Sequence, residues 1–159
     1  MNSNSKAMNT FNRSRLIWTN PWIFIACGFG IGTLPIMPGT YATIASALLC
    51  LLLAKLNLTF YIAVVALLNI AGVWLCGYAN KAFGTDDHPA AVWDEIAAFP
   101  ITLIAIPFTW YYLLIAIVLF RIFDILKPWP ICWIDKNLHG GLGVMLDDIL
   151  AALASWVVL

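Results

Sequence analysis

Seven charged side chains lie inside or at the ends of segments that are otherwise apolar. They are five acids and two bases: Asp94, Glu95, Arg121, Asp124, Lys127, Asp147 and Asp148. Charged groups in a membrane cost about 2.5–3.5 kcal/mol each even on lenient insertion scales, so a functional role is the first hypothesis for them. Together they predict a site for a metal ion and a phosphate group at the face of a membrane.

The first of these sets is a ladder of alternating charge. Arg121, Asp124 and Lys127 follow one another at a spacing of three, which places them on one sector of a helix. Arginine binds phosphate through two parallel hydrogen bonds, so we expect Arg121 and Lys127 to bind substrate. Asp124 would then act in catalysis, by holding a metal ion or by orienting the arginine. The alternative is an internal salt-bridge ladder in which the lysine only reaches back to the interface.

Two pairs of adjacent acids open apolar segments. Asp94-Glu95 stands at the start of one, and Asp147-Asp148 follows a glycine-rich turn at the start of another. Acids are favourable near any helix N-terminus, which is the simpler explanation. Carboxylates from several helices, with cationic groups opposite them, also suit Mg²⁺ bound jointly with phosphate oxygens. We therefore predict all four as metal ligands; the absence of a CxxC pair argues against a thiolate zinc site.

Two loop histidines and one helix start complete the candidate site. His88 or His139 could protonate a leaving alkoxide, although a loop histidine is often merely solvated. Gly39 and Thr40 follow a proline-rich breaker, where the exposed N–H groups of a new helix could bind an anion. Ordinary capping by Thr40 explains the same pattern equally well.

Composition indicates the elements that must position these groups. The chain is 63% hydrophobic and 10% charged, with a mean hydropathy of +0.92, whereas soluble domains carry about 25% charged residues. This predicts an all-α, polytopic integral membrane bundle with membrane lipids around it. A formal net charge of zero argues against a nucleic-acid partner. We expect residues 1–20 to be a flexible, polar, cytoplasmic segment and residues 21–159 to be one transmembrane catalytic domain.

About five spans are expected, over 40–56, 58–83, 92–107, 110–127 and 143–159. The apolar stretch 22–34 would cover only about 20 Å as a helix, against a hydrocarbon core of about 30 Å, so we predict a re-entrant N-terminal helix there. If the N-terminus is cytoplasmic, every lysine and arginine except Lys55 lies on the cytoplasmic side. The charged residues that form the candidate site then lie on that same side.

Several motifs match a known family. The most specific are the blocks Phe120–Asp124, Lys127–Pro130, Asp135–Gly141 and Asp147–Ile149, preceded by Gly28–Pro35, Pro38–Thr40, Asp87-His88 and Val92–Glu95. The chain resembles the phosphatidylglycerophosphatase A family over nearly its whole length after Asn20. The resemblance implies a Mg²⁺-dependent phosphatase of the bacterial inner membrane, which converts the anionic lipid phosphatidylglycerophosphate to phosphatidylglycerol and inorganic phosphate.

The expected mechanism is direct hydrolysis at the cytoplasmic face, because no side chain stands out as a covalent nucleophile. Two alternatives stay open from the residues alone. One is a phosphatase of another lipid phosphate, and the other is a small transporter with a buried charge relay. The sequence indicates no protein partner.

Overall fold

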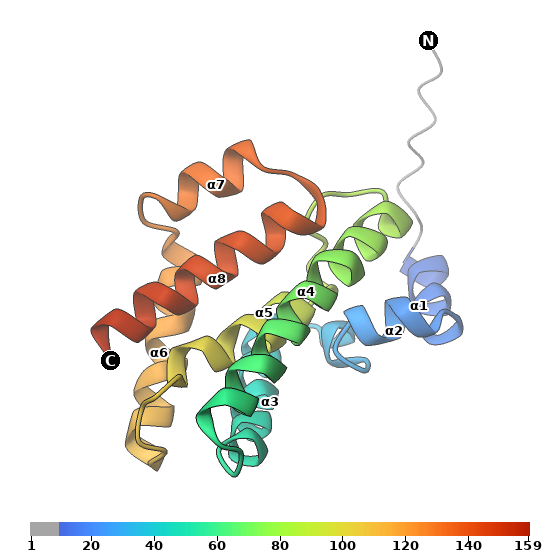
Figure 1. The fold of residues 1–159 in the computed structure, drawn as a ribbon. Helices are drawn as coiled ribbons and strands as arrows, with labels where there is room; N and C mark the ends of the chain where they lie inside the picture. Colours follow the sequence, from blue (N-terminus) through green and yellow to red (C-terminus); the bar gives the residue numbers. More distant parts are fainter. Residues whose placement is uncertain (1–9) are drawn as a thin grey trace.

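The computed structural model describes residues 10–159, and these residues form helices and turns without a strand. The elements are α1 (Thr10–Thr19), α2 (Pro21–Ala26), η1 (Ile31–Thr33), α3 (Pro38–Leu53), α4 (Leu58–Phe83), α5 (Trp93–Ala98), η2 (Phe99–Leu103), α6 (Trp110–Leu126), α7 (Ile131–Asn137) and α8 (Gly140–Val158) (Figure 1). The predicted all-α class is confirmed. Of the predicted polar segment 1–20, residues 1–9 lie outside the described part, and the helix α1 covers most of the rest.

Helices α4 and α8 are long and apolar enough to cross a membrane. They pack against each other (Figure 1), and two glycines allow their backbones to approach closely. A Cβ atom added to Gly141 would collide with the carbonyl oxygen of Val73 and would lie 2.9 Å from the Cα atom of Gly77. Because this contact brings the start of α8 against α4, it sets where α8 presents its two aspartates.

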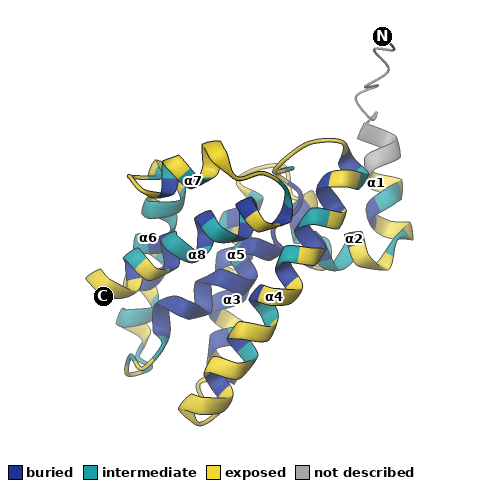
Figure 2. Cartoon of the chain, turned by 45° about the horizontal axis from the view of Figure 1, so that its top comes forward, coloured by how far each residue is buried: buried dark blue, intermediate teal, exposed yellow. Residues whose placement is uncertain are grey.

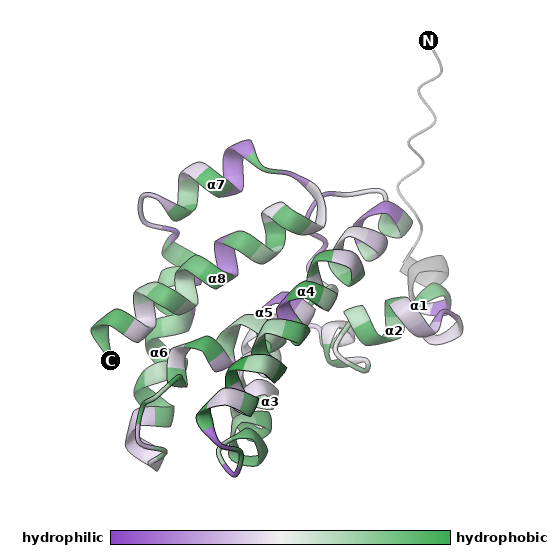
Figure 3. Cartoon of the chain, in the orientation of Figure 1, coloured by the Kyte–Doolittle hydropathy of each residue, from purple (hydrophilic) through white to green (hydrophobic). Residues whose placement is uncertain are grey.

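The outer faces of the bundle are apolar. Large hydrophobic side chains are exposed along α3, α4 and α6: Leu48, Leu51, Leu52, Phe60, Ile62, Leu67, Ile70, Leu114, Ile115, Val118, Ile122, Ile125 and Leu126. Figures 2 and 3 show exposed yellow on much of the outer surface of α4, and green hydrophobic colour along α3, α4 and α6. Exposed apolar surface of this extent is unlike that of soluble monomers. Together with the two long apolar helices, it points to association with a membrane.

The structure differs from the single helix expected over residues 92–107. Helix α5 ends at Ala98 and the chain continues as the 3₁₀ helix η2, which contains Pro100. Proline has no N–H group and disrupts a helix interior, so the break has a local cause. Nearly every residue of α5 and η2 is buried, and this segment lies among the other helices (Figure 2).

Side chains from neighbouring helices bond the carbonyl groups that this break leaves free. Ser46 Oγ on α3 donates to the carbonyl oxygen of Ile96 at 2.7 Å. Asn69 Nδ2 on α4 donates to the carbonyl oxygen of Ala97 at 2.8 Å. Buried carbonyl groups need such partners. These two bonds therefore fix the short helix that carries the first acidic pair.

The apolar stretch 22–34, expected as one re-entrant helix, is broken into two short helices joined by a turn. Helix α2 gives way at Cys27 to a turn, in which Gly28 and Gly30 have positive φ angles of 58° and 95°, and then to η1. A Cβ atom on Gly28 would lie 2.8 Å from the Ile96 side chain, so glycine lets this turn pack directly on α5. Between the expected spans 110–127 and 143–159, the chain forms the short helix α7.

Candidate active site

A cavity of about 360 Å³ brings most of the predicted site residues together. Its lining includes Gly39, Asp94, Glu95, Arg121, Asp124, Lys127, Asp147 and Asp148. These residues come from α3, α5 and α8, from α6 and from the residue that follows α6. Asp87, in the loop after α4, lines the cavity too and was not among the predicted site residues.

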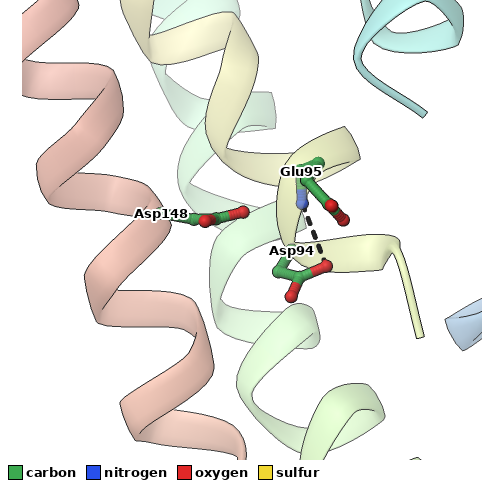
Figure 4. Close-up of side chains that lie close together, drawn as sticks. All are labelled: Asp94, Glu95 and Asp148. Carbon is green, nitrogen blue, oxygen red and sulfur yellow. Dashed lines mark hydrogen bonds between the residues drawn. The ribbon is translucent and has the colours of Figure 1, made fainter. Parts of the chain in front are cut away.

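Three carboxylates form a cluster suited to a cation. One oxygen each from Asp94, Glu95 and Asp148 lies within 4.8 Å of the others. Figure 4 shows Asp148 projecting from α8 toward the pair on α5. The backbone N–H of Glu95 donates to Asp94 Oδ1 at 3.1 Å and so orients the first carboxylate. Asp94 and Asp148 are 6% and 4% exposed, which takes both charges out of solvent.

The cluster contains oxygens that the protein itself does not satisfy. Within the described residues, the buried Glu95 Oε2 and Asp148 Oδ2 have no hydrogen-bond partner. Buried carboxylates that lie close together repel one another unless a cation or protons neutralise them. Neither thiol nor imidazole belongs to the cluster, and an all-oxygen donor set is what Mg²⁺ prefers. The donor set therefore fits a hard divalent ion.

Asp147, predicted as a fourth metal ligand, is bonded differently from Asp148. Its Oδ2 atom accepts a hydrogen bond from Lys127 Nζ at 2.5 Å, and its Oδ1 atom accepts from the N–H of Asp148 at 3.1 Å. Lys127 Nζ also lies 2.5 Å from Asp135 Oδ1 on α7. The lysine therefore joins α8 to α7, and Asp147 lies in the cavity wall as its ion-pair partner.

Arg121 lies between the acidic cluster and the start of α3. Its Nη1 atom is 2.5 Å from Asp124 Oδ2 and 3.6 Å from Glu95 Oε1. Its buried Nε atom has no partner in the part of the chain that the structure describes. A Cβ atom on Gly39 would lie 3.0 Å from Nη1 and would collide with Glu95 Oε1, so glycine makes room for both side chains. Among residues 10–159, only Nη1 of the guanidinium has protein acceptors, so donors on its other nitrogens are unused.

The remaining predicted residues lie outside the lining. Thr40 is next to the cavity, and its buried Oγ1 atom is without a partner among residues 10–159. His88 packs on Phe83, with ring centroids 4.3 Å apart, and its Nδ1 atom accepts from the N–H of Ala90 at 3.1 Å. His139 is the N-cap residue of α8 and lines a second cavity instead. Neither histidine therefore belongs to the lining of the cavity that holds the carboxylates.

Asp87 reaches the cavity because of its backbone conformation. Its φ angle is 55°, which is uncommon for a residue other than glycine. The residue as a whole is exposed, yet protein closely surrounds its carboxyl group, and this desolvation raises the pKa of Asp87. Its signals in the sequence are its place in a polar loop and the pair Asp87-His88 among the matched motifs.

The fold and the cavity define a class: a membrane-associated helical bundle with a cavity lined by clustered carboxylates and by two basic side chains. Comparison with known protein families shows that the family "Phosphatidylglycerophosphatase A" matches residues 24–159 of the chain. The phosphatidylglycerophosphatase A of Escherichia coli is 44% identical over 144 residues, which cover 90% of this chain and 84% of that protein. That of Haemophilus influenzae is 40% identical over 141 residues, covering 87% and 86%.

The chain belongs to the phosphatidylglycerophosphatase A family. A further relative, from Bacteroides thetaiotaomicron, bears a name that proposes a phosphatidylinositol-3-phosphatase; it is 37% identical over 145 residues, covering 86% of this chain and 90% of that protein. No solved structure matches the chain.

Proposed function

We propose that this chain is a lipid phosphatase, which hydrolyses phosphatidylglycerophosphate to phosphatidylglycerol and inorganic phosphate. Membership of the family supports the reaction and the substrate. The observation that carries the proposal is the cavity in which the cluster Asp94, Glu95 and Asp148 faces Arg121. A phosphomonoester needs both a cation for its oxygens and a fixed donor, and this cavity contains residues for both.

The metal part of the proposal assigns Mg²⁺ to Asp94, Glu95 and Asp148. The unsatisfied oxygens of Glu95 and Asp148 support this donor set. When bound, the ion would neutralise phosphate charge and lower the pKa of a water molecule that serves as the nucleophile. Asp147 is better assigned to Lys127, whose ammonium group it holds at the cavity wall.

The chain's own residues bind the phosphate and supply a proton. Arg121 binds phosphate oxygens with the guanidinium donors that Asp124 does not use, while Asp124 fixes the plane of the guanidinium. Lys127 adds a second positive charge to the lining. The leaving glycerol oxygen needs a proton, and His88 lies outside the lining. Asp87 is the better candidate, since it lines the cavity and partial desolvation raises the pKa of its carboxyl group, which brings it closer to the range useful for an acid.

We further propose a multi-pass arrangement in the bacterial inner membrane, with the cavity open to the cytoplasm. The apolar outer faces of α3, α4 and α6 support contact with lipid. The bias of lysines and arginines toward one side supports the orientation. In this arrangement α3, α4, α6 and α8 cross the bilayer, the buried α5–η2 segment passes between them, and the broken stretch 22–34 enters and leaves on the cytoplasmic side.

A second candidate substrate has an observation in its favour. The Bacteroides relative is named for a phosphoinositide, and it covers 86% of this chain, against 90% and 87% for the other two relatives. The cavity recognises a phosphomonoester and a divalent ion, and both features are common to several lipid phosphates. A transporter is less well supported, because the buried charges converge on one cavity instead of marking a path.

Phosphate release from phosphatidylglycerophosphate in mixed micelles tests the proposal, with Mg²⁺ present or removed by chelation. Glu95→Gln and Asp148→Asn should each lower turnover by roughly 100-fold or more, because even outer-shell changes at metal sites cost about 10–100-fold. Lys55→Gln is the control, since this exposed lysine, in the turn between α3 and α4, lies outside the cavity lining and also loses a charge.

Wild-type turnover in both cluster variants would show that the metal assignment is wrong. Replacing the substrate by phosphatidylinositol 3-phosphate or phosphatidic acid in the same assay decides which lipid is preferred.

A further inference from the structure

A second and larger cavity, of about 690 Å³, lies between the C-terminal half of α4 and the start of α8. We refer to it as the α4–α8 groove. Its lining comprises Val73, Trp74, Gly77, Tyr78, Asn80, Lys81, Gly84, Thr85, Asp86, His139, Gly140, Gly141 and Leu142. In Figure 1 the loop after α4 and the N-terminal end of α8 lie close together. A Cβ atom added to Gly84 or to Gly140 would meet nothing within 4 Å, so the groove is open at both positions.

An unpaired amide lines this groove. Asn80 is 4% exposed, and its Nδ2 atom has no hydrogen-bond partner among the residues the structure describes. Its Oδ1 atom accepts from the N–H of His88 at 3.4 Å, which assigns the nitrogen to the other side. A buried amide nitrogen without an acceptor costs free energy, so its presence points to a ligand with an acceptor oxygen.

The start of α8 adds further donors to the same groove. Gly140, Gly141 and Leu142 line it, and the N-cap residue His139 makes no side-chain hydrogen bond to the helix. The first N–H groups of a helix lack partners within the helix, and the helix dipole makes this end positive. Together with the Asn80 amide, these groups match an anion with several oxygens, such as phosphate.

Two charged side chains line the rim of the groove, and together they permit the binding of an anion. Lys81 lies in the last turn of α4 and is exposed, so its ammonium group can approach an anion in the groove. Asp86 is the acid in the lining, and it too is exposed, which lets solvent screen its charge. The buried donors therefore decide the preference for an anion.

One wall of the groove is aromatic and apolar. Trp74 is 51% exposed and stacks on Tyr78, with ring centroids 5.7 Å apart, and Leu142 is also 51% exposed. Amphipathic rings of this kind are enriched at the headgroup level of membranes. A free phosphate ion would use the donors but not this wall. A phospholipid uses both.

The groove is separate from the cavity that holds the carboxylates. Their linings share no residue, and neighbouring residues of one loop divide them: Asp86 faces the groove and Asp87 the cavity. Along α8, Gly141 and Asp147 are six residues apart, which corresponds to about 9 Å of helical rise. One phosphate group cannot occupy both places.

We propose that the α4–α8 groove binds the phosphodiester headgroup of an anionic phospholipid, at a site distinct from the one where the substrate is hydrolysed. The phosphodiester oxygens accept hydrogen bonds from Asn80 Nδ2 and from the first N–H groups of α8, and Lys81 supplies the opposite charge. The glycerol and the start of the acyl chains lie along Trp74 and Leu142. The bound lipid joins α4 to α8 at the end of the bundle where the loop between the two cavities begins.

Thermal unfolding of the full chain in a neutral detergent, titrated with a short-chain phosphatidylglycerol, tests this proposal. The lipid should raise the melting temperature of the wild type, because a ligand of the folded state stabilises it. Asn80→Asp keeps an acceptor for the His88 N–H but replaces the amide donor by a negative charge. The half-maximal lipid concentration should rise roughly 10–100-fold, the loss expected for a hydrogen bond to a charged group.

Two further variants make the result decisive. Lys81→Gln changes an exposed residue, so it folds even if Asn80→Asp does not, and it should raise the half-maximal concentration by about 2–5-fold. Arg121→Gln, in the carboxylate cavity, should keep the full response to lipid.

An unchanged response in both groove variants overturns the proposal, as does loss of the response in Arg121→Gln. Inorganic phosphate that reproduces the shift at equal concentration also overturns it, because the site would then bind the free ion. Phosphate release is not measured here, so this result is independent of the proposed hydrolysis.

Discussion

Replacing Ser46 by alanine should release the short helix that carries the acidic pair Asp94-Glu95. Ser46 is fully buried, and its Oγ atom donates to the carbonyl oxygen of Ile96 at 2.7 Å. In a continuous helix the N–H four residues later would bond this carbonyl, but that residue is Pro100. Without the hydroxyl group, the carbonyl has no hydrogen donor in its helical register.

The size of the effect follows from that missing donor. A buried polar group left unsatisfied costs about 1–3 kcal/mol. For a chain of this size, each kcal/mol lowers the melting temperature by about 2–4 °C. Ile96 directly follows Glu95, so relaxation of α5 also moves the carboxylate cluster. Misplacement by about 1 Å can lower turnover roughly 100-fold, and activity should therefore fall with stability.

Ser155→Ala provides a matched control. Ser155 is also fully buried, and its Oγ atom donates to the carbonyl oxygen of Ala151 at the same distance of 2.7 Å. That carbonyl lies within α8 and keeps the backbone N–H of residue 155. Its loss should cost less than about 1 kcal/mol, because no acceptor is left without a donor. Thermal unfolding in detergent and phosphate release are measured for both variants.

Equal melting temperatures for the two variants would refute the reasoning, since the helix break would then need no external donor. Wild-type turnover in a clearly destabilised Ser46→Ala protein would refute the link from α5 to the cluster.

Two more changes probe the cavity. In Gly39→Ala, the new methyl group would lie 3.0 Å from Arg121 Nη1 and collide with Glu95 Oε1, so turnover should fall about 100-fold. The melting temperature should stay the same, because alanine favours a helix over glycine by about 1 kcal/mol. Undiminished turnover would contradict the predicted collision. Lys127→Gln leaves the Asp147 side chain, 6% exposed, without its ion pair; this should cost about 3–5 kcal/mol. Adding Asp147→Asn should restore much of that stability, and a single variant that unfolds like the wild type would show that the pair contributes little.

Helix positions were predicted from local sequence wherever the length of an apolar segment and its capping residues indicate the same ends. The predicted segment 58–83 is the helix α4, which begins after Asn57, whose Oδ1 atom accepts from the N–H of Phe60, and ends at Gly84 with a φ angle of 72°. The common orientation of Arg121, Asp124 and Lys127 was predicted equally well, because a spacing of three places side chains on one sector of a helix.

Convergence of the charges on one cavity was also predictable, because groups so costly in apolar segments must find partners. The sequence did not predict which of the charged residues would face the metal site and which would form an ion pair. Adjacent residues on a helix diverge by about 100°, so either aspartate of the Asp147-Asp148 pair could have faced the metal site. Packing against α5 and the reach of Lys127 turned Asp148 to the cluster and Asp147 to the lysine.

The orientation of loop side chains and the partners of the broken helix α5 also depended on contacts between distant segments. Pro100 indicates where the helix must break. The side chains that donate to the carbonyls freed by this break, Ser46 and Asn69, lie 50 and 28 residues along the chain from the groups they bond. Asp87 enters the cavity and His88 turns onto Phe83 through backbone angles of a loop that no periodicity describes. Local sequence thus decides where helices form and which charges need partners, while contacts between distant segments decide which partner each one receives.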